Sequence, residues 1–118
     1  MFSRPTLVRA TLGSTVTLAP GQTADFEGGA LKLLFSDVSE DSRCPRDVVC
    51  ITAGHAVARV SLESKVQRQD TSLEVVGSTS KRESVLGRFQ LQYDITPYPV
   101  STKRIAKSDY RLSVTATD

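Results

Sequence analysis

Residues 87–95 read Gly-Arg-Phe-Gln-Leu-Gln-Tyr-Asp-Ile and hold the clearest structural pattern of the chain. Apolar side chains alternate with polar ones along this stretch, at Phe89, Leu91, Tyr93 and Ile95. Successive side chains of a β-strand point to opposite faces of the sheet, so the pattern predicts a strand with one buried and one solvated face. The same period of two extends over residues 56–62 and 110–116, and over residues 31–36 with an interruption at Leu34.

Turn-forming residues separate these strands from shorter candidates at residues 7–12, 15–18, 23–26 and 72–76. Ala19-Pro20-Gly21-Gln22 fits a type II turn, because Pro fixes φ at the second position and Gly accepts a positive φ at the third. Further reversals are expected at Glu27-Gly28-Gly29-Ala30, Asp70-Thr71 and residues 77–80. About eight short strands predict an all-β fold over residues 1–118. We expect a single antiparallel β-sandwich, immunoglobulin-like, with a β-barrel as the alternative.

Composition excludes several classes of protein. With 118 residues, 39% of them hydrophobic, and a net charge of +2, the chain has enough apolar surface for one folded domain and is not disordered. No apolar run of about 18 residues is present, so no membrane span is predicted. A pI near 8.7 with scattered positive charges predicts no nucleic-acid partner. The N-terminal sequence has no signal-peptide pattern, which leaves a cytosolic protein or a mature segment.

The one long connection, residues 39–55, contains both cysteines. Cys44 and Cys50 have a C-x5-C spacing, which favours a small disulfide-closed ring over two free thiols, a metal site or a catalytic thiol. A disulfide implies an oxidising compartment. We therefore expect a secreted or periplasmic protein whose signal peptide is absent from this chain.

The same connection holds the first set of candidate interaction residues: Glu40, Asp41, Arg43, Arg46, Asp47 and His55. Three interpretations stay open for it. It is a rigid corner that covers one end of the sandwich, or a calcium site that uses Asp37 with the other acidic residues, or an inhibitory loop that offers Arg46 to a protease. No metal site is predicted as the main interpretation, because no established ligand spacing is present.

A second candidate patch combines an aromatic side chain between two prolines with three cations, at Tyr98, Lys103, Arg104 and Lys107. With a single histidine and no recognised catalytic motif, the chain is not expected to be an enzyme or to bind a cofactor. The predicted function is a non-catalytic binding or structural module. Its partner would be an unknown protein, peptide or glycan.

Residues 38–45, Val-Ser-Glu-Asp-Ser-Arg-Cys-Pro, and the following Cys50-Ile51-Thr52-Ala53-Gly54-His55-Ala56 carry a resemblance. This block resembles a motif of small, largely uncharacterised bacterial secreted or lipoprotein-type β domains. The resemblance extends to the Gly21-Gln22 turn and the Tyr110–Leu112 strand. It implies a β fold outside the cytoplasm and a lipid anchor on a precursor, but no established activity. Thr52 departs from the motif, where a tryptophan is expected.

Overall fold

The computed structural model describes residues 7–76, 81–102 and 104–118. Nine strands and one short 3-10 helix, η1 (Lys107–Asp109), occur in this part of the chain. The strands are β1 (Leu7–Ala10), β2 (Thr15–Leu18), β3 (Thr23–Phe26), β4 (Leu31–Asp41), β5 (His55–Glu63), β6 (Arg68–Val76), β7 (Lys81–Val85), β8 (Phe89–Thr96) and β9 (Arg111–Thr117). The expected turn at residues 77–80 lies outside the described residues.

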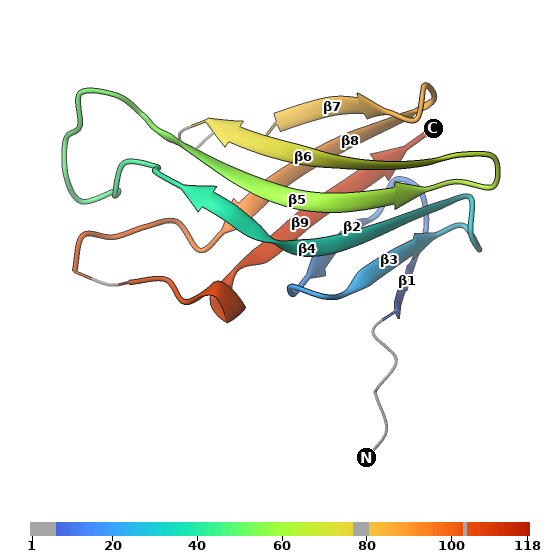
Figure 1. Ribbon diagram of the computed structural model, residues 1–118, viewed down its shortest axis with the longest axis horizontal. Coiled ribbons are helices and arrows are strands. Elements are labelled where there is room, and N and C mark those ends of the chain that lie inside the picture. The colour runs from blue at the N-terminus through green and yellow to red at the C-terminus, as the bar shows by residue number, and fades with distance from the viewer. Residues whose placement is uncertain (1–6, 77–80, 103) are drawn as a thin grey trace, which may run out of the picture.

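The strands form two sheets that stack face to face, in the orders β1-β3-β4-β5-β6 and β2-β9-β8-β7 (Figure 1). All neighbouring strands pair antiparallel except β1, which runs parallel to β3. The predicted β-sandwich is confirmed, with nine strands where about eight were expected, and the sheets do not close into a barrel. Within the sandwich, β3 to β6 and β7 to β9 are meanders. In immunoglobulin domains, by contrast, successive strands change sheets more often.

The alternating side chains predicted from the sequence fill the space between the sheets. Phe89, Leu91, Tyr93 and Ile95 of β8 are at most 2% exposed, whereas Gln90 and Gln92 between them face solvent. From the opposite sheet, β3, β4 and β5 contribute the buried side chains Phe26, Phe35 and Leu62. Burial of these apolar faces between the sheets is the main stabilisation of the fold.

Strand β4 continues to Asp41, further than the alternation predicted. Its pairing with β5 shifts register between Phe35 and Asp37, and again between Val38 and Glu40. Such β-bulges add a residue to one strand and change which side chains face inward. Val38 is therefore buried, although its distance from Phe35 does not fit an uninterrupted period of two. The connection between β4 and β5 therefore comprises residues 42–54 and is shorter than the predicted connection, residues 39–55.

Of the other predicted turns, one is corrected and one is confirmed. Asp70-Thr71 lies inside β6, paired with Ser61 and Val60 of β5, and is not a turn. The reversal occurs at residues 64–67, where the Ser64 amide donates to the Gln67 carbonyl at 2.8 Å. The predicted Ala19–Gln22 turn is confirmed by the hydrogen bond from the Gln22 amide to the Ala19 carbonyl and by a φ of 91° at Gly21.

The two long connections, residues 42–54 and residues 97–110, extend from the same end of the sandwich (Figure 1). We call these two segments together the loop end. The β5–β6 hairpin lies at the opposite end of the molecule. The loop end contains Arg43, Arg46 and Asp47 of the first candidate set and Tyr98, Arg104 and Lys107 of the second, so the fold brings these residues to one end of the molecule.

Candidate functional site

The first connection of the loop end is closed by a disulfide between Cys44 and Cys50, with Cα atoms 5.9 Å apart. The preferred interpretation of the C-x5-C spacing is thus confirmed. We call residues 44–50 the ring. Backbone pairing holds the base of the ring, because the Ser42 amide donates to the His55 carbonyl and the Cys44 amide donates to the Ala53 carbonyl. Gly54 has a φ of 68°, and a Cβ there would lie 1.8 Å from the Ser42 carbonyl oxygen, so this approach requires glycine.

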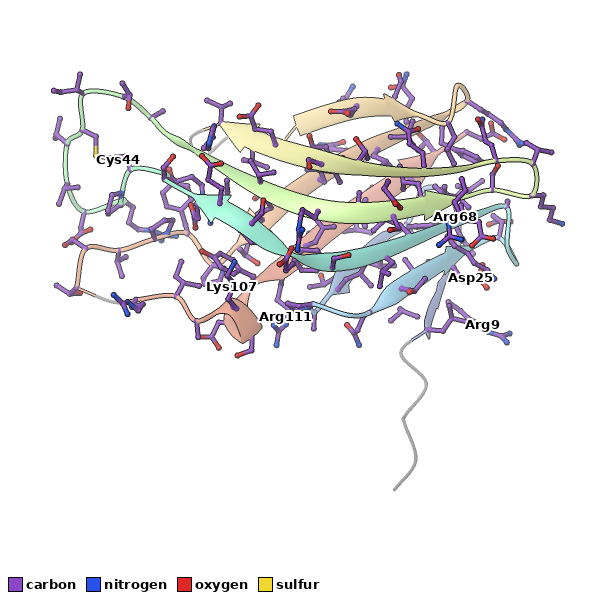
Figure 2. All side chains as sticks on the ribbon, in the orientation of Figure 1. Arg9, Asp25, Cys44, Arg68, Lys107 and Arg111 are labelled. Atoms are coloured by element: carbon purple, nitrogen blue, oxygen red, sulfur yellow. A yellow bond between two sulfur atoms is a disulfide. The ribbon has the colours of Figure 1, made fainter. Side chains whose placement is uncertain are left out.

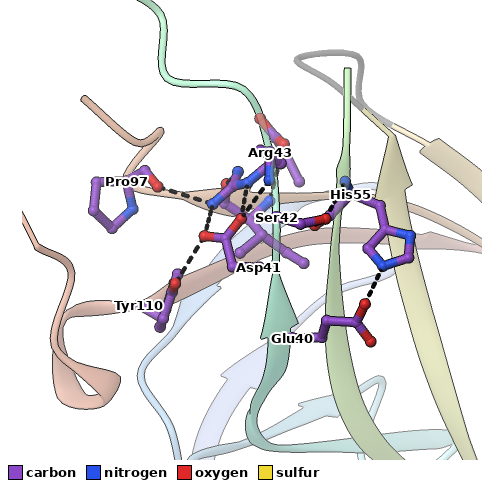
Figure 3. A network of polar contacts seen from close by, with 9 residues as sticks. Glu40, Asp41, Ser42, Arg43, His55, Pro97 and Tyr110 are labelled. Carbon is purple, nitrogen blue, oxygen red and sulfur yellow. Dashed lines mark hydrogen bonds and ion pairs between the residues drawn. The ribbon is translucent and has the colours of Figure 1, made fainter. Parts of the chain in front are cut away.

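Behind the ring, the guanidinium of Arg43 is buried, with the residue only 3% exposed (Figure 3). Its Nε and Nη2 atoms donate to the two carboxylate oxygens of Asp41, both at 2.9 Å. Its Nη1 and Nη2 atoms also donate to the carbonyls of Ile95 at 2.6 Å and Pro97 at 3.1 Å. A bidentate carboxylate and two carbonyls satisfy the planar fork of donors that arginine presents. The side chain therefore ties the first connection to the end of β8.

The carboxylate of Asp41 has a second donor, the hydroxyl of Tyr110 at 2.7 Å (Figure 3). Burial alone would raise the pKa of Asp41, but the hydrogen bonds from Arg43 and Tyr110 outweigh it and lower the pKa below its ordinary value. Burial, together with the hydrogen bond to this carboxylate, raises the pKa of Tyr110 to about 12. Arg43, Asp41 and Tyr110 form a network in which the two opposite charges are paired and the carboxylate accepts hydrogen bonds from both other side chains. It acts as the support of the loop end.

The second connection of the loop end is fastened directly to the ring. The Arg46 amide donates to the Pro99 carbonyl at 3.0 Å. The amide and hydroxyl of Ser101 donate to the Asp47 carboxylate at 2.9 and 2.5 Å. These hydrogen bonds lower the pKa of Asp47, with the one from the Ser101 hydroxyl as the largest cause. The two connections therefore behave as one braced unit.

Tyr98 joins the two predicted sets of residues. The guanidinium carbons of Arg43 and Arg46 lie 5.1 and 5.6 Å from the centre of its ring. Tyr98 is half-buried between them and is not a free platform for a glycan. Arg46 is exposed in a turn of the ring, with its side chain against this aromatic face. That arrangement does not favour the inhibitory interpretation, because the guanidinium lies against Tyr98 and is not extended from the ring toward a protease pocket.

Two of the three cations of the predicted second patch lie within the described residues. Arg104 is exposed at the loop end. Lys107 begins η1, and its Nζ atom donates to the Val38 carbonyl at 2.5 Å. Lys103 lies outside the described residues. The structure thus brings Tyr98 to Arg43 and Arg46, a pairing that the sequence did not predict.

His55, the only histidine of the chain, begins β5 and lies between two carboxylates. Its Nε2 atom is 2.5 Å from Glu40 (Figure 3) and its Nδ1 atom is 2.6 Å from Glu74 of β6. The hydrogen bond to Glu40, and then the charges of both carboxylates, raise the pKa of His55. The residue joins three adjacent strands by ion pairs, and its two nitrogens point to different carboxylates.

The acidic side chains considered for calcium do not converge. Asp37 binds Arg59 of β5 at 2.7 and 2.9 Å, Glu40 binds His55, Asp41 binds Arg43, and Asp47 binds Ser101. Among the residues that the structure describes, no group of three or more metal-binding side chains is present. Each carboxylate is instead engaged by its own donor, so the arrangement does not support a calcium site.

Sequence reasoning missed the apolar side chains of the loop end. Val49 and Ile51 are 100% and 103% exposed, and Val48 is 44% exposed. Val48 and Val49 belong to the ring, and Ile51 directly follows its closing residue, Cys50. We call these three residues the tip. The signal was present in the sequence, because aliphatic residues beside a short disulfide ring have no continuing strand that would bury them.

Comparison of the chain with protein-family models, with curated proteins and with solved structures finds no match. The resemblance to secreted or lipoprotein-type β domains therefore stays a prediction. Within the described ranges, no helix has the length and apolar character needed to cross a membrane.

Proposed function

We propose that this protein is a non-catalytic binding module of an extracytoplasmic compartment and that it binds its partner through the loop end. The observation that carries the proposal is the full exposure of Val49, in the disulfide-closed ring, and of Ile51, directly after it. Exposed single aliphatic residues are ordinary on protein surfaces. Here they are grouped on a loop that the protein braces from three directions.

The bracing supports a binding function because it lowers the entropy lost on association. The disulfide, the buried Arg43 and the Asp47–Ser101 hydrogen bonds fix the ring before any partner arrives. A loop that is already ordered loses less conformational freedom when it binds than a flexible one. A surface that served only to cover the core would not need its apolar side chains turned outward.

The environments of the titratable groups support a non-catalytic function. His55 is held by Glu40 and Glu74, and Asp41 is committed to Arg43 and Tyr110. General acid–base catalysis needs a group free to exchange a proton with a substrate. The disulfide supports an oxidising location. The proposal therefore also groups the chain with the secreted β domains that its residues 40–56 resemble.

A site-specific crosslinking experiment tests the proposed function. In one variant, a photoreactive amino acid replaces Val49 at the loop end. In the matched control, it replaces Val66, which is 88% exposed and lies in the β5–β6 hairpin. In cells that produce the protein, we expect adducts from position 49 and few from position 66. Equal yields from both ends would contradict the proposal. Alkylation of the native protein without reductant should label neither cysteine, and labelling of both would remove the argument for location.

A further inference from the structure

We propose that the loop end binds an anionic lipid surface, with Val49 and Ile51 entering the headgroup region and Arg46 and Arg104 facing the lipid phosphates. This inference rests on the proposed function and names its partner class. It is built on two independent observations, the shape of the apolar tip and the distribution of charge over the molecule.

The tip has the form that a lipid interface accepts. Val49 and Ile51 lie on either side of Cys50 in the chain and are fully exposed to solvent, and the disulfide of Cys50 to Cys44 closes the ring. A bilayer interface takes up a protruding apolar group without any matching pocket, because its headgroup and acyl region is fluid. A protein partner would need a complementary pocket, and protein interfaces draw their affinity mainly from Trp, Tyr and Arg in such pockets.

The charge of the chain is concentrated at the same end. Residues 42–54 and 97–110 carry five Lys/Arg and two Asp/Glu. One of these cations, Arg43, is buried and paired with Asp41, so the remaining charged residues of the two segments have a net charge of +2, and the rest of the chain, without Asp41, has a net charge of 0. An anionic leaflet attracts basic residues placed beside an apolar anchor. Electrostatic attraction between these basic residues and the anionic lipids would therefore orient the protein with its loop end toward such a membrane.

Two cations of the loop end are exposed, one on each of its two connections. Arg46 belongs to the ring and is exposed, with Tyr98 beneath its guanidinium. Arg104 is exposed on the connection that the Asp47–Ser101 hydrogen bonds fasten to the ring. Cys44 of the ring lies at one extreme of the molecule, whereas Arg9, Asp25 and Arg68 lie toward the other (Figure 2).

Vesicle sedimentation tests the inference with the full chain. Vesicles of phosphatidylcholine mixed with phosphatidylglycerol are compared with vesicles of phosphatidylcholine alone. We expect partition into the anionic vesicles to weaken about tenfold or more in the Val49→Ser/Ile51→Ser variant, since the apolar contacts are lost. The Arg46→Gln/Arg104→Gln variant should weaken about fivefold per charge removed and should depend less on salt.

Val66→Ser is the matched control. Val66 is 88% exposed in the opposite hairpin and has cations nearby, at Lys65 and Arg68, but it lies on no braced ring. This variant should partition like the unmodified protein, and all three variants should keep its thermal midpoint, because each changes only exposed side chains. An equal loss in Val66→Ser, or a failure of the protein to partition into anionic vesicles, would overturn the inference.

The result separates this inference from the proposed function. If the vesicles do not bind the protein but the photoreactive group at position 49 still gives adducts with a protein partner that position 66 does not give, the lipid assignment is wrong and the binding surface stands. If neither experiment distinguishes the two ends, both proposals are overturned. If position 49 yields lipid adducts and the vesicles bind, both are supported.

Discussion

The guanidinium of Arg43 is held by groups that come from both sheets. Asp41 ends β4, in the first sheet, while Ile95 and Pro97 come from the end of β8 and the connection that follows it. A buried charge is costly unless it is paired and its donors are satisfied, and here both conditions are met. The pair therefore fixes the position of the loop end relative to the core.

Removing one member of this pair should be strongly destabilising. Asp41→Asn leaves the Arg43 charge buried without its counter-charge, and we expect the free energy of unfolding to fall by about 3–5 kcal/mol. Asp37→Asn is the control, since its pair with Arg59 has side chains that are 31% and 58% exposed and should contribute at most about 1 kcal/mol. Urea unfolding of both variants measures the difference. Equal losses would show that Asp41 contributes no more than a surface ion pair.

His55 gives a direct test of local electrostatics, because the chain has one histidine and its ring signals in NMR are unambiguous. Both ring nitrogens face carboxylate oxygens, and both can donate only when the imidazole is protonated. The pKa should therefore lie above its ordinary value of about 6.5. Glu40→Gln should lower it more than Glu74→Gln, because the hydrogen bond to Glu40 is the largest cause. An unchanged titration in Glu40→Gln would contradict the assigned geometry.

At the scale of elements, the disulfide ring stiffens only the connection between β4 and β5. The stability of the sandwich itself comes from its buried apolar core. Closing seven residues removes a limited amount of chain entropy from the unfolded state. The Cys44→Ser/Cys50→Ser variant should therefore lose about 2.4 kcal/mol of stability and still unfold cooperatively. Hydrogen exchange should rise over residues 42–54 but not in β8 or β9, where the core contacts are unchanged. Loss of the folded sandwich in this variant would contradict the local role of the disulfide.

The sequence predicted the elements whose own side chains alternate, and missed those defined by their partners. Strand β8 was clear because its apolar period is unbroken. Strand β7, Lys-Arg-Glu-Ser-Val, has only one apolar residue and becomes a strand because β8 pairs with it. The first half of β6 is likewise polar and is ordered by pairing with β5. In β4, the two bulges interrupt the period that the prediction followed.

The contacts of the candidate site likewise fall into two groups, those between residues close in the sequence and those between residues far apart in it. Asp41 and Arg43 were both in the first candidate set, and two residues this close in the chain meet readily at a strand end. The contacts of Arg43 with Ile95 and Pro97 span more than fifty positions, and no local pattern carries them. The joining of the ring to the Tyr98 connection therefore had to come from the structure.

At the scale of the whole molecule, the groups that titrate predict a stability maximum at mildly acidic pH. Asp37, Asp41, Asp47 and Asp118 have lowered pKa values, because they accept hydrogen bonds from Arg59, Arg43, Ser101 and Arg88. A carboxyl group whose folded pKa is lowered stabilises the fold above its unfolded value, near 4, and loses this contribution as pH falls through the folded pKa. His55, with a raised pKa, contributes fully below about 6.5 and loses its contribution as pH rises through its folded value.

The midpoint of urea unfolding should therefore be highest between about pH 5 and 6, and should fall on both sides. The two limbs have different causes and can be separated by substitution. Asp41→Asn should flatten the fall below about pH 4, because it removes a buried carboxylate that is ionised in the folded state. His55→Gln should flatten the fall above about pH 6.5 and leave the acid limb unchanged. A midpoint that stays constant down to about pH 2, or an alkaline limb that persists without His55, would show that these ion pairs do not link folding to protonation.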